Sequence, residues 1–403
     1  MKSNYRVSAT VHLEKIRENL ITMSNHVGED KEIMAVVKAD GYGHGAVQVA
    51  NYVEDLPTLW GFGVATVGEA VELREGGIKK PIIVFGCVFP EEIEDLITYD
   101  IIATIYTLEA GKIFNQVALD SNAVIKAHIK VDTGMARLGF LPTDENMKIV
   151  AQIAQMSNLR IEGMYSHYAK SDEKDLEFTY HQHDKCLRFY EGVTDILKME
   201  DHQCTINERK DNDSNDKLSC NSIEKTALRY FHCSNSGGII SYPESKGNLV
   251  RGGISTYGYY PSQDVPKDKV VLQPALTLTS HVSFVKEVEA GTPVSYGGTY
   301  VTTGSTKIAT IPVGYGDGYP RSLSNLGEVL IGGKRCKILG RVCMDQFMVD
   351  VTHLQDVKMM DPVVLIGKMG EEEITVGELS DLSGRFNYEF LCCLGKRVPR
   401  VYV

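Results

Sequence analysis

The chain has 403 residues, of which 43% are apolar and 24% charged, as in a soluble globular protein too long for a single core. Its formal net charge of -11 argues against nucleic acid or an anionic membrane as partner and favours a small molecule. No apolar run is long enough to span a membrane and no signal peptide precedes the first strand-like run, so we expect a cytoplasmic protein. The nine cysteines lack metal-ligand spacing, and we expect reduced thiols and no metal site.

Short apolar runs alternate with longer amphipathic segments from about residue 33 to residue 253, which predicts alternating strands and helices. The predicted strands are Ile33–Val37, Trp60–Ala65, Pro81–Gly86, Asp100–Ile105, Val124–Val131, Leu159–Ser166, Leu228–Cys233 and Asn248–Val250. Helices between them include Thr66–Glu75, Glu91–Tyr99 and Thr143–Met156. Eight such units in roughly 250 residues are typical of an α/β protein with a (β/α)8 TIM-type barrel, although an open doubly wound sheet shows the same alternation.

Two parts of the chain depart from this alternation. Residues 199–225 are polar and mixed in charge, and we expect a mobile surface insertion there. After residue 271 the chain becomes rich in strand-like runs, namely Leu276–Val285, Lys307–Val313, Glu328–Ile331, Val342–Val351 and Pro362–Ile366, before helices at 375–382 and 387–394. We therefore predict a barrel over residues 12–271, a mostly β C-terminal domain over 272–403, and an N-terminal strand, residues 1–11, that joins the second domain.

Polar residues and glycines gather where the predicted strands end. Lys38 follows the first strand, Lys130 and Arg137 the fifth, His167 the sixth, Ser236 the seventh, and Arg251 with Gly253 the eighth. Taken singly, each has an ordinary explanation, such as a solvated lysine, a surface ion pair or a satisfied histidine. In a barrel, however, all these strand ends share one rim. Their common position favours an active site and, with it, the barrel over the open sheet.

The residue types at this rim indicate a class of chemistry. Lys38 is placed to act as an amine nucleophile, and Ser236 with neighbouring glycine amides is suited to hold a phosphate. A lysine that forms a Schiff base beside a phosphate cradle suggests pyridoxal phosphate, with Arg251 at the ring nitrogen. A barrel enzyme without a cofactor is the alternative that these residues alone leave open.

Four longer motifs make the interpretation specific. They are Ala35–Gly45 (AVVKADGYGHG), Lys130–Gly139 (KVDTGMARLG), Gly314–Arg321 (GYGDGYPR) and Gly340–Gln346 (GRVCMDQ). In these motifs, and over nearly its whole length, the chain resembles bacterial alanine racemases, which depend on pyridoxal phosphate. The resemblance implies the interconversion of L-alanine and D-alanine, with D-alanine supplied for peptidoglycan.

The resemblance also implies a homodimer in which the β domain of each chain completes the active site of the other. Lys38 would hold the cofactor covalently and act as one catalytic base, and Tyr296 of the partner subunit would act as the other. A proton could then leave one face of the substrate and return on the opposite face. His167, linked in turn to Arg251, would keep Tyr296 able to accept that proton.

Further roles follow from the resemblance, position by position. Arg137 and the backbone of Met344 would bind the substrate carboxylate, supported by Asp345 and by Lys130, which is often carbamylated in the family. The cofactor phosphate would be bound by Tyr42, Ser236, Gly253, Ile254 and Tyr388.

Three other functions remain as alternatives: a serine or broad-specificity amino-acid racemase, a decarboxylase of the same barrel class, and a non-catalytic carrier of the cofactor. Tyr388 favours alanine, because related serine racemases have a smaller polar residue at the equivalent position. The chain departs from the family pattern in the insertion near 200–225 and at Gly252, which we expect to loosen the backbone near the phosphate.

Overall fold

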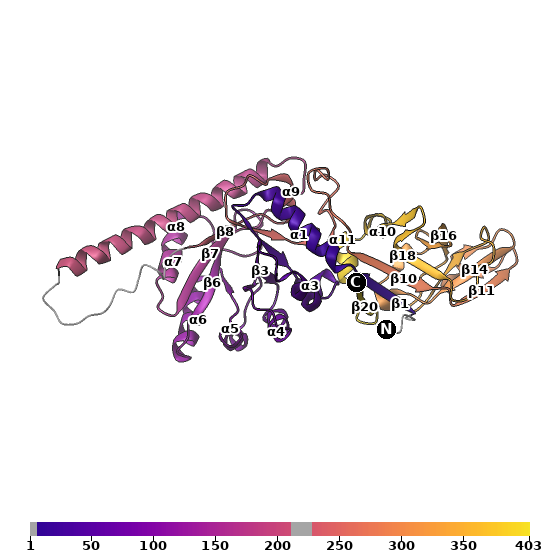
Figure 1. Cartoon of the computed structure of the whole chain (residues 1–403), viewed down its shortest axis with the longest axis horizontal. Helices are drawn as coiled ribbons and strands as arrows, with labels where there is room; N and C mark the ends of the chain where they lie inside the picture. Colours follow the sequence, from indigo (N-terminus) through magenta and orange to yellow (C-terminus); the bar gives the residue numbers. More distant parts are fainter. Residues whose placement is uncertain (1–5, 211–227) are drawn as a thin grey trace. The chain divides into compact units, whose positions relative to one another are not determined.

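The computed structural model describes residues 6–210 and 228–403 (Figure 1). Contacts divide the chain into two compact units. The barrel unit consists of Ile16–Ala39 and Val49–Gln273. The β unit consists of the chain up to Lys15, the short segment Asp40–Gln48, and Pro274–Val403.

Eight parallel strands form the barrel unit. They are β2 (Glu32–Val36), β3 (Leu59–Val64), β4 (Ile82–Val84), β5 (Ala103–Ile105), β6 (Ile125–Lys130), β7 (Leu159–Tyr165), β8 (Tyr230–His232) and β9 (Leu249–Gly252). Their ladders follow the orders β4-β3-β2-β9 and β5-β6-β7-β8. Backbone bonds join both edges, since Ile102 N donates to Ile82 O (2.8 Å) and Arg251 N donates to Ser234 O (3.0 Å). The sheet is therefore closed, which confirms the (β/α)8 barrel and excludes the open sheet.

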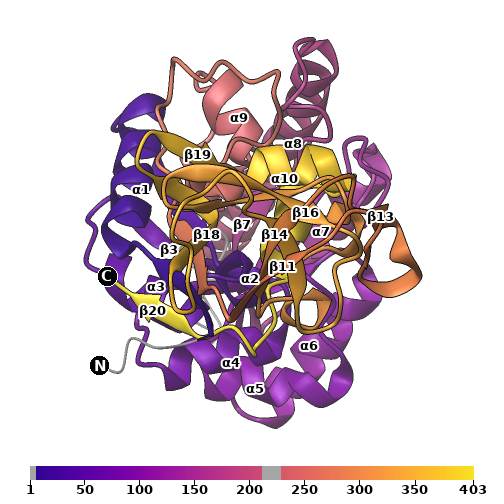
Figure 2. The same ribbon diagram turned by 90° about the vertical axis from the view of Figure 1, so that its right-hand side faces the viewer.

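Helices cover the outside of the barrel (Figure 2). They are α1 (Leu13–Val27), α3 (Ala46–Val53), α4 (Val67–Glu75), α5 (Ile93–Thr98), α6 (Leu108–Asp120), α7 (Asp144–Ala154), α8 (Glu177–Lys210) and α9 (Ser236–Ser241). The side chains of Thr66, Thr107 and Thr143 accept backbone hydrogen bonds at the starts of α4, α6 and α7. Each cap satisfies a backbone donor that the helix itself leaves unpaired, and so fixes where the helix begins.

The interior of the barrel is filled by side chains from successive strands. Met34, Trp60, Ile83, Ile102, Tyr165 and Leu249 form one buried cluster. All six residues of β3 are buried, because the strand is covered by side chains on one face and by helices on the other. This two-sided burial explains why the predicted strands appear as continuous apolar runs rather than as alternating ones.

The predicted mobile surface insertion at residues 199–225 begins within a helix. Helix α8 continues through this region to Lys210 and extends well beyond the strands (Figure 1). Residues such as Met199, Glu200 and Lys210 have good helix propensity, so an established helix can continue without an apolar face. The rest of the predicted insertion, residues 211–225, lies outside the described residues.

The β unit contains one large sheet with the strand order β11-β14-β17-β16-β15-β18-β10-β1-β20. In chain order these are β1 (Val7–Val11), β10 (Leu276–His281), β11 (Phe284–Val288), β14 (Thr306–Ile311), β15 (Glu328–Ile331), β16 (Lys334–Leu339), β17 (Phe347–Asp350), β18 (Pro362–Met369) and β20 (Arg400–Tyr402). The short strands β12 (Pro293–Val294), β13 (Tyr300–Val301) and β19 (Glu372–Ile374) and the helices α10 (Val376–Ser383) and α11 (Asn387–Cys392) complete it. Strand β1 pairs antiparallel with β10 and parallel with β20.

Two predicted strands of this unit differ from the structure. The run at 276–285 is divided into β10 and β11, because Val282 and Ser283 leave the ladder between them. The run at 342–351 forms a strand only from Phe347 onward. Its first half is a loop in which the carbonyls of Cys343 and Met344 accept hydrogen bonds from Tyr315 and Gly316. Strands β12, β13, β16, β19 and β20 were not predicted.

The segment Asp40–Gln48 is part of the β unit, although its sequence neighbours belong to the barrel unit. Arg400 Nε donates to Gly43 O (2.9 Å). A Cβ atom on Gly43 would lie 2.3 Å from Leu391 O, so only glycine fits there. Apolar periodicity gives no sign of this assignment, since it rests on backbone contacts with residues far away in sequence.

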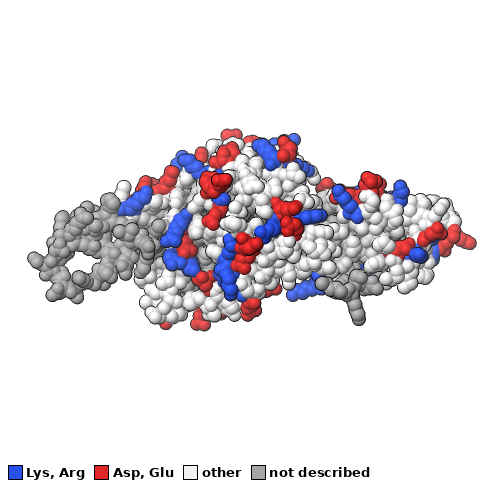
Figure 3. Space-filling model, in the orientation of Figure 1, with Lys and Arg blue, Asp and Glu red and all other residues white. Residues whose placement is uncertain are grey.

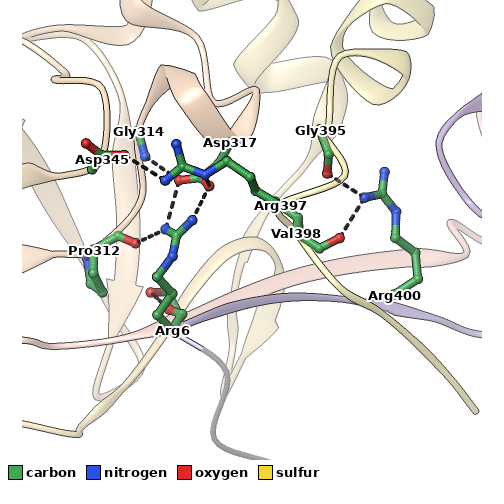
Figure 4. A network of polar contacts seen from close by, with 10 residues as sticks. Arg6, Pro312, Gly314, Asp317, Asp345, Gly395, Arg397, Val398 and Arg400 are labelled. Carbon is green, nitrogen blue, oxygen red and sulfur yellow. Dashed lines mark hydrogen bonds and ion pairs between the residues drawn. The ribbon is translucent and has the colours of Figure 1, made fainter.

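A buried carboxylate organises the loops of the β unit (Figure 4). Asp317, which is 1% exposed, accepts hydrogen bonds from the guanidinium of Arg6 and from Gly314 N (3.1 Å). Arg397 lies 3.4 Å from Asp317 and 2.6 Å from Asp345, so its guanidinium bridges the two carboxylates. These bonds tie the Gly314–Arg321 motif to the loop that contains Met344.

The described part of one face of the molecule shows no concentration of one charge. Lys and Arg side chains are interspersed with Asp and Glu over the described part of the face in Figure 3. Within residues 6–210 and 228–403, no helix is long and apolar enough to cross a membrane. The same residues contain no cluster of three or more His, Cys, Asp or Glu that could hold a metal ion.

Two glycines of the β unit allow a test of its packing. Gly318 has φ +98°, and a Cβ there would lie 2.0 Å from Cys393 O, whereas Gly332 has φ +58° and open space around it. We expect Gly332→Ala to cost only the left-handed backbone penalty, about 1 kcal/mol, and Gly318→Ala to cost about 3 kcal/mol or more. Urea unfolding of both variants measures this difference, and equal losses would show that the turn at Gly318 is not tightly packed.

Candidate active site

Lys38 stands at the start of an unusual turn. Strand β2 ends at Val36, and the helical turn α2 (Lys38–Tyr42) follows with φ near +50° at Ala39, Asp40 and Tyr42. A left-handed backbone costs about 1–2 kcal/mol at each residue other than glycine. Such strain is characteristic of functional sites, where the surrounding structure maintains it.

Glu69, near the start of α4, helps to hold this turn. Its Oε1 accepts a hydrogen bond from Ala39 N (2.7 Å), and its Oε2 accepts one from Ala65 N (2.7 Å). The carboxylate therefore fixes the backbone immediately after Lys38, and it also completes the capping box with Thr66. Sequence reasoning missed this residue, because a capping box explains a glutamate at this position without any further role.

Arg251, on β9, is the centre of the rim. It is 3% exposed, and Nη1 donates to Nδ1 (2.7 Å) and O (3.0 Å) of His232. Nη2 donates to the carbonyls of Ser166 and Cys233 (both 2.8 Å) and to Nδ1 of His167 (3.2 Å). Among the described residues, Nε alone of the three guanidinium nitrogens makes no hydrogen bond, and it remains available for a ligand.

The pKa of His167 reflects the charges around it. Burial lowers its pKa well below the ordinary value, and the positive charges of Arg251, Arg137, Lys130 and Lys38 lower it further, in that order. Five residues predicted from four strand ends thus lie in one electrostatic environment. The imidazole is neutral at physiological pH, and its Nδ1 must be the unprotonated nitrogen because Arg251 can only donate.

Lys130, at the end of β6, is almost completely buried. Its Nζ donates to Val131 O (2.7 Å) and lies 5.5 Å from the ring centre of Tyr165. Burial, and then the charge of Arg251, lower the pKa of Lys130 from 10.5 to about 8. A lysine in this range has a substantial neutral fraction, which makes its nitrogen a nucleophile near neutral pH.

Arg137 is exposed at the end of a loop that Asp132 organises. Asp132 Oδ1 accepts hydrogen bonds from the backbone N–H groups of Gly134, Met135 and Ala136 (2.9–3.1 Å). Its Oδ2 accepts one from Arg137 N (3.0 Å). Four bonds to one carboxylate give the loop a single shape and fix the point from which the Arg137 side chain extends. Sequence reasoning missed Asp132, although it lies within the Lys130–Gly139 motif.

Two turns after β8 and β9 share one hydroxyl group. Ser236 Oγ accepts hydrogen bonds from Gly253 N (3.0 Å) and Ser255 N (3.3 Å), so the two turns are held together. Ile254 lies between these residues and is fully buried. Gly252 is not loose, because a Cβ there would lie 2.8 Å from Thr256 Oγ1, and Thr256 Oγ1 donates to Gly252 O (3.0 Å). The expectation that Gly252 loosens this backbone is wrong.

The remaining candidate residues belong to the β unit. The rings of Tyr42 and Tyr388 have centres 5.9 Å apart, and Tyr388 stacks on Phe386 at 4.5 Å. Tyr296 is 72% exposed and Met344 52% exposed. Met344 lies in the loop held by Gly316, and the neighbouring Asp345 is paired with Arg397 at 2.6 Å.

Taken by itself, the barrel rim offers an amine on a strained turn, a buried arginine with one unused donor, and a hydroxyl between two glycine-containing turns. These groups suit a ligand that carries a carbonyl carbon, a ring acceptor and an anionic group. The arrangement therefore supports amine-based covalent chemistry on a small molecule.

Comparisons with known proteins agree with this chemistry. The family model described as alanine racemase, N-terminal domain, matches residues 11–207, and that described as alanine racemase, C-terminal domain, matches residues 275–402. The alanine racemase of Desulforamulus reducens is 40% identical over 395 residues, which are 98% of this chain and 98% of that protein. That of Carboxydothermus hydrogenoformans is 42% identical over 397 residues, which are 98% and 99% of the two chains.

Solved structures give the same result. The alanine racemase of Clostridium difficile 630 has a TM-score of 0.87 and 36% identity, with 100% of this chain and 97% of that chain covered. The Bacillus anthracis alanine racemase with bound L-Ala-P has a TM-score of 0.86 and 30% identity, with 100% and 96% covered.

The bonds to Asp132 predict an effect of pH on stability. Burial alone would raise its pKa, but the N–H groups of Gly134, Ala136 and Met135 and the charge of Lys130 outweigh burial and lower it. The resulting stabilisation is complete above the unfolded-state pKa near 4 and is lost as pH falls through the lower folded-state pKa. Asp132→Asn should reduce the free energy of unfolding by about 2 kcal/mol at neutral pH, because an amide cannot accept all four bonds.

Urea unfolding as a function of pH measures this contribution. The difference between the wild type and Asp132→Asn should shrink as pH falls below about 4. The exposed Asp268 in the same unit provides a matched control, and Asp268→Asn should change stability by less than about 0.5 kcal/mol. A difference between wild type and Asp132→Asn that is constant across pH would contradict the assigned bonds.

Proposed function

The chain belongs to the alanine racemase family, and on that basis we propose that Lys38 and Tyr296 of the partner subunit are its two catalytic bases. Family membership itself gives the reaction and the cofactor: the protein is an isomerase that interconverts L-alanine and D-alanine with pyridoxal phosphate. Its substrate is accordingly a small amino acid. The roles of individual residues are our proposal.

The barrel rim fits the cofactor. Lys38 would hold it through Nζ, and the Nε–H group of Arg251, which no described residue accepts, would face its ring nitrogen. Ser236, Gly253 and Ile254 would bind its phosphate together with Tyr42 and Tyr388. The unused Nε donor of Arg251 supports this assignment, because the other two nitrogens of the same guanidinium are already bonded to the protein and Nε is left to meet an acceptor on a ligand. Bound pyridoxal phosphate supplies an electron sink that makes the α-hydrogen of the amino acid acidic.

The protein groups then bind the substrate and move its proton. Arg137, and the backbone of Met344 from the partner subunit, would hold the substrate carboxylate and so set which face of the α-carbon points to each base. Lys38 Nζ would exchange a proton with one face, and Tyr296 Oη of the partner subunit would exchange a proton with the other. Two bases on opposite faces invert the α-carbon without any rotation of the substrate. His167 would contact Tyr296 and hold it in place for this transfer.

The exposure of Tyr296 supports a shared site. Tyr296 is 72% exposed, and the hydroxyl of the adjacent Ser295 donates to Arg341 O (2.7 Å) in the motif that contains Met344. An exposed aromatic side chain in this position is suited to enter another protein surface. Tyr315 in the same unit is 43% exposed. We therefore propose a homodimer in which Tyr296, Met344 and Asp345 of each chain contribute to the site of the other. We further propose a cytoplasmic location and a role in supplying D-alanine for peptidoglycan.

Mixing two inactive variants tests the shared site. Lys38→Ala and Tyr296→Phe should each abolish racemisation, and Tyr296→Phe should retain the absorbance of the bound cofactor. When the two variants are mixed and subunits exchange, half of the dimers contain one chain of each kind, and one of their two sites has both bases. Activity should therefore return to about a quarter of the wild-type value.

Mixing two preparations of Lys38→Ala provides the control for this experiment and should give no activity. If the two different variants remain inactive after exchange is demonstrated, both bases come from the same chain and the shared site is wrong.

The lowered pKa of Lys130 supports its carbamylation. With a pKa of about 8, roughly a tenth of the side chain is the neutral amine at pH 7, far more than for a solvated lysine. The amine nitrogen can attack carbon dioxide to form an N–C bond and release a proton. Protein equilibrated with 13C-bicarbonate should show a carbamate resonance by NMR that is absent from Lys130→Ala. A wild-type spectrum without this signal would leave Lys130 as an unmodified amine.

A further inference from the structure

Behind Arg251, a line of hydrogen bonds runs into the interior of the barrel. Nη1 of Arg251 donates to Nδ1 of His232 (2.7 Å), and Nε2 of His232 lies 3.0 Å from Nδ1 of His128. Both imidazoles are fully buried. His128 comes from the middle of β6 and His232 from the end of β8, so the line connects three different strands.

The chemistry of the donors determines where every proton in this line lies. A guanidinium has no acceptor, so His232 Nδ1 must be unprotonated and His232 must carry its proton on Nε2. That proton requires an acceptor, and His128 Nδ1 is the atom within reach. His128 must then carry its own proton on Nε2. A proton on His128 Nδ1 would instead make His232 donate toward Arg251, which places two donors face to face.

We propose that His128 is a positioning residue that fixes the proton of His232 on Nε2, and thereby holds Arg251 with its Nε directed to the ring nitrogen of the cofactor. The consequence for the cofactor rests on the function proposed above, whereas the proton positions rest only on the hydrogen bonds. Neither histidine touches the reacting atoms.

Three further observations support this arrangement. His128 Nε2 is a buried atom without a hydrogen-bond partner among the described residues. This is expected if each group donates to the next one, from Arg251 to His232 to His128, and no acceptor follows His128. Burial, and then the charge of Arg251, lower the pKa of both imidazoles, that of His128 to about 3, so both rings are neutral. The ring of Tyr165 stacks on His232 at 4.8 Å and 2°, which holds the plane of the middle imidazole.

If His128 only filled space in the barrel interior, an apolar side chain would be more favourable at this position. A buried donor without an acceptor is costly, and an apolar side chain at position 128 would avoid it. Position 128 is nevertheless a histidine, and its Nδ1 lies 3.0 Å from Nε2 of His232, where the proton positions inferred above make it the acceptor. This is the observation that separates a positioning role from simple packing.

Histidine ring nitrogens can be observed directly. A 15N-labelled sample gives two-bond proton–nitrogen correlations that distinguish Nδ1-protonated, Nε2-protonated and charged rings. In the protein without cofactor, and again in the holoenzyme, we expect His128 and His232 to be neutral with the proton on Nε2 between pH 6 and pH 9. A proton on Nδ1 of either ring, or a charged His232, would overturn the proposal, whether or not the enzyme racemises alanine.

Two substitutions test the effect on Arg251. In His128→Asn the amide oxygen can take the place of Nδ1 as acceptor, whereas His128→Leu has a similar size but no acceptor. We expect His128→Leu to weaken pyridoxal phosphate binding by about tenfold, shift the absorbance of the bound cofactor, and lower kcat with little change in KM for alanine. His128→Asn should remain within about threefold of the wild type.

The outcomes distinguish the possible roles of His128. Equal loss in both variants would show that His128 acts through packing alone and would overturn the proposal. A Leu-specific loss of cofactor affinity and shift in absorbance supports it, even in a preparation whose racemisation is too slow to measure. The His128→Asn sample also removes one ring from the NMR spectrum and so assigns the His128 signals.

Discussion

A buried guanidinium bonded to neutral groups determines the properties of this site. Arg251 is 3% exposed, and its hydrogen-bond partners in the described chain are three carbonyls and two imidazoles, with no carboxylate among them. No carboxylate of the described chain is hydrogen-bonded to it. Its charge lowers the pKa of His167, His232 and Lys130, in each case after burial has done so. The two imidazoles are therefore neutral, and Lys130 has a larger neutral fraction than a solvated lysine, although the residue types of the rim alone suggest a cluster of cations.

The same arginine suits the reaction of the family. An arginine cannot act as an acid near neutral pH, so Arg251 in its proposed position would leave the ring nitrogen unprotonated. The bound cofactor would then be a weaker electron sink than one with a carboxylic acid partner, and negative charge at the α-carbon would be less stabilised. Prompt return of a proton is favoured over longer rearrangements, which agrees with racemisation rather than decarboxylation. Two well-placed bases matter more in this situation than a strong sink.

Much of this organisation could be predicted from sequence, because it depends on local pattern. Continuous apolar runs that end on Lys38, Lys130, His167 and Arg251 predicted the barrel strands and the rim to within a few residues. The supports of the rim were missed, because Glu69 and Asp132 act by accepting backbone N–H bonds whose geometry depends on the folded loops. The assignment of Asp40–Gln48 to the β unit was missed, because it depends on contacts with residues far away in sequence. The continuation of α8 to Lys210 was missed, because an established helix can continue without an apolar face.

The two-base reaction can be tested most directly by following the α-hydrogen itself. L-alanine carrying deuterium at the α-carbon is converted in ordinary water, and the D-alanine formed at low conversion is analysed by chiral separation and mass spectrometry. With Lys38 on one face and Tyr296 of the partner subunit on the other, the proton that returns is not the one that left. D-alanine with almost no deuterium is therefore predicted. D-alanine that retains a substantial fraction of the label would show that a single base serves both faces.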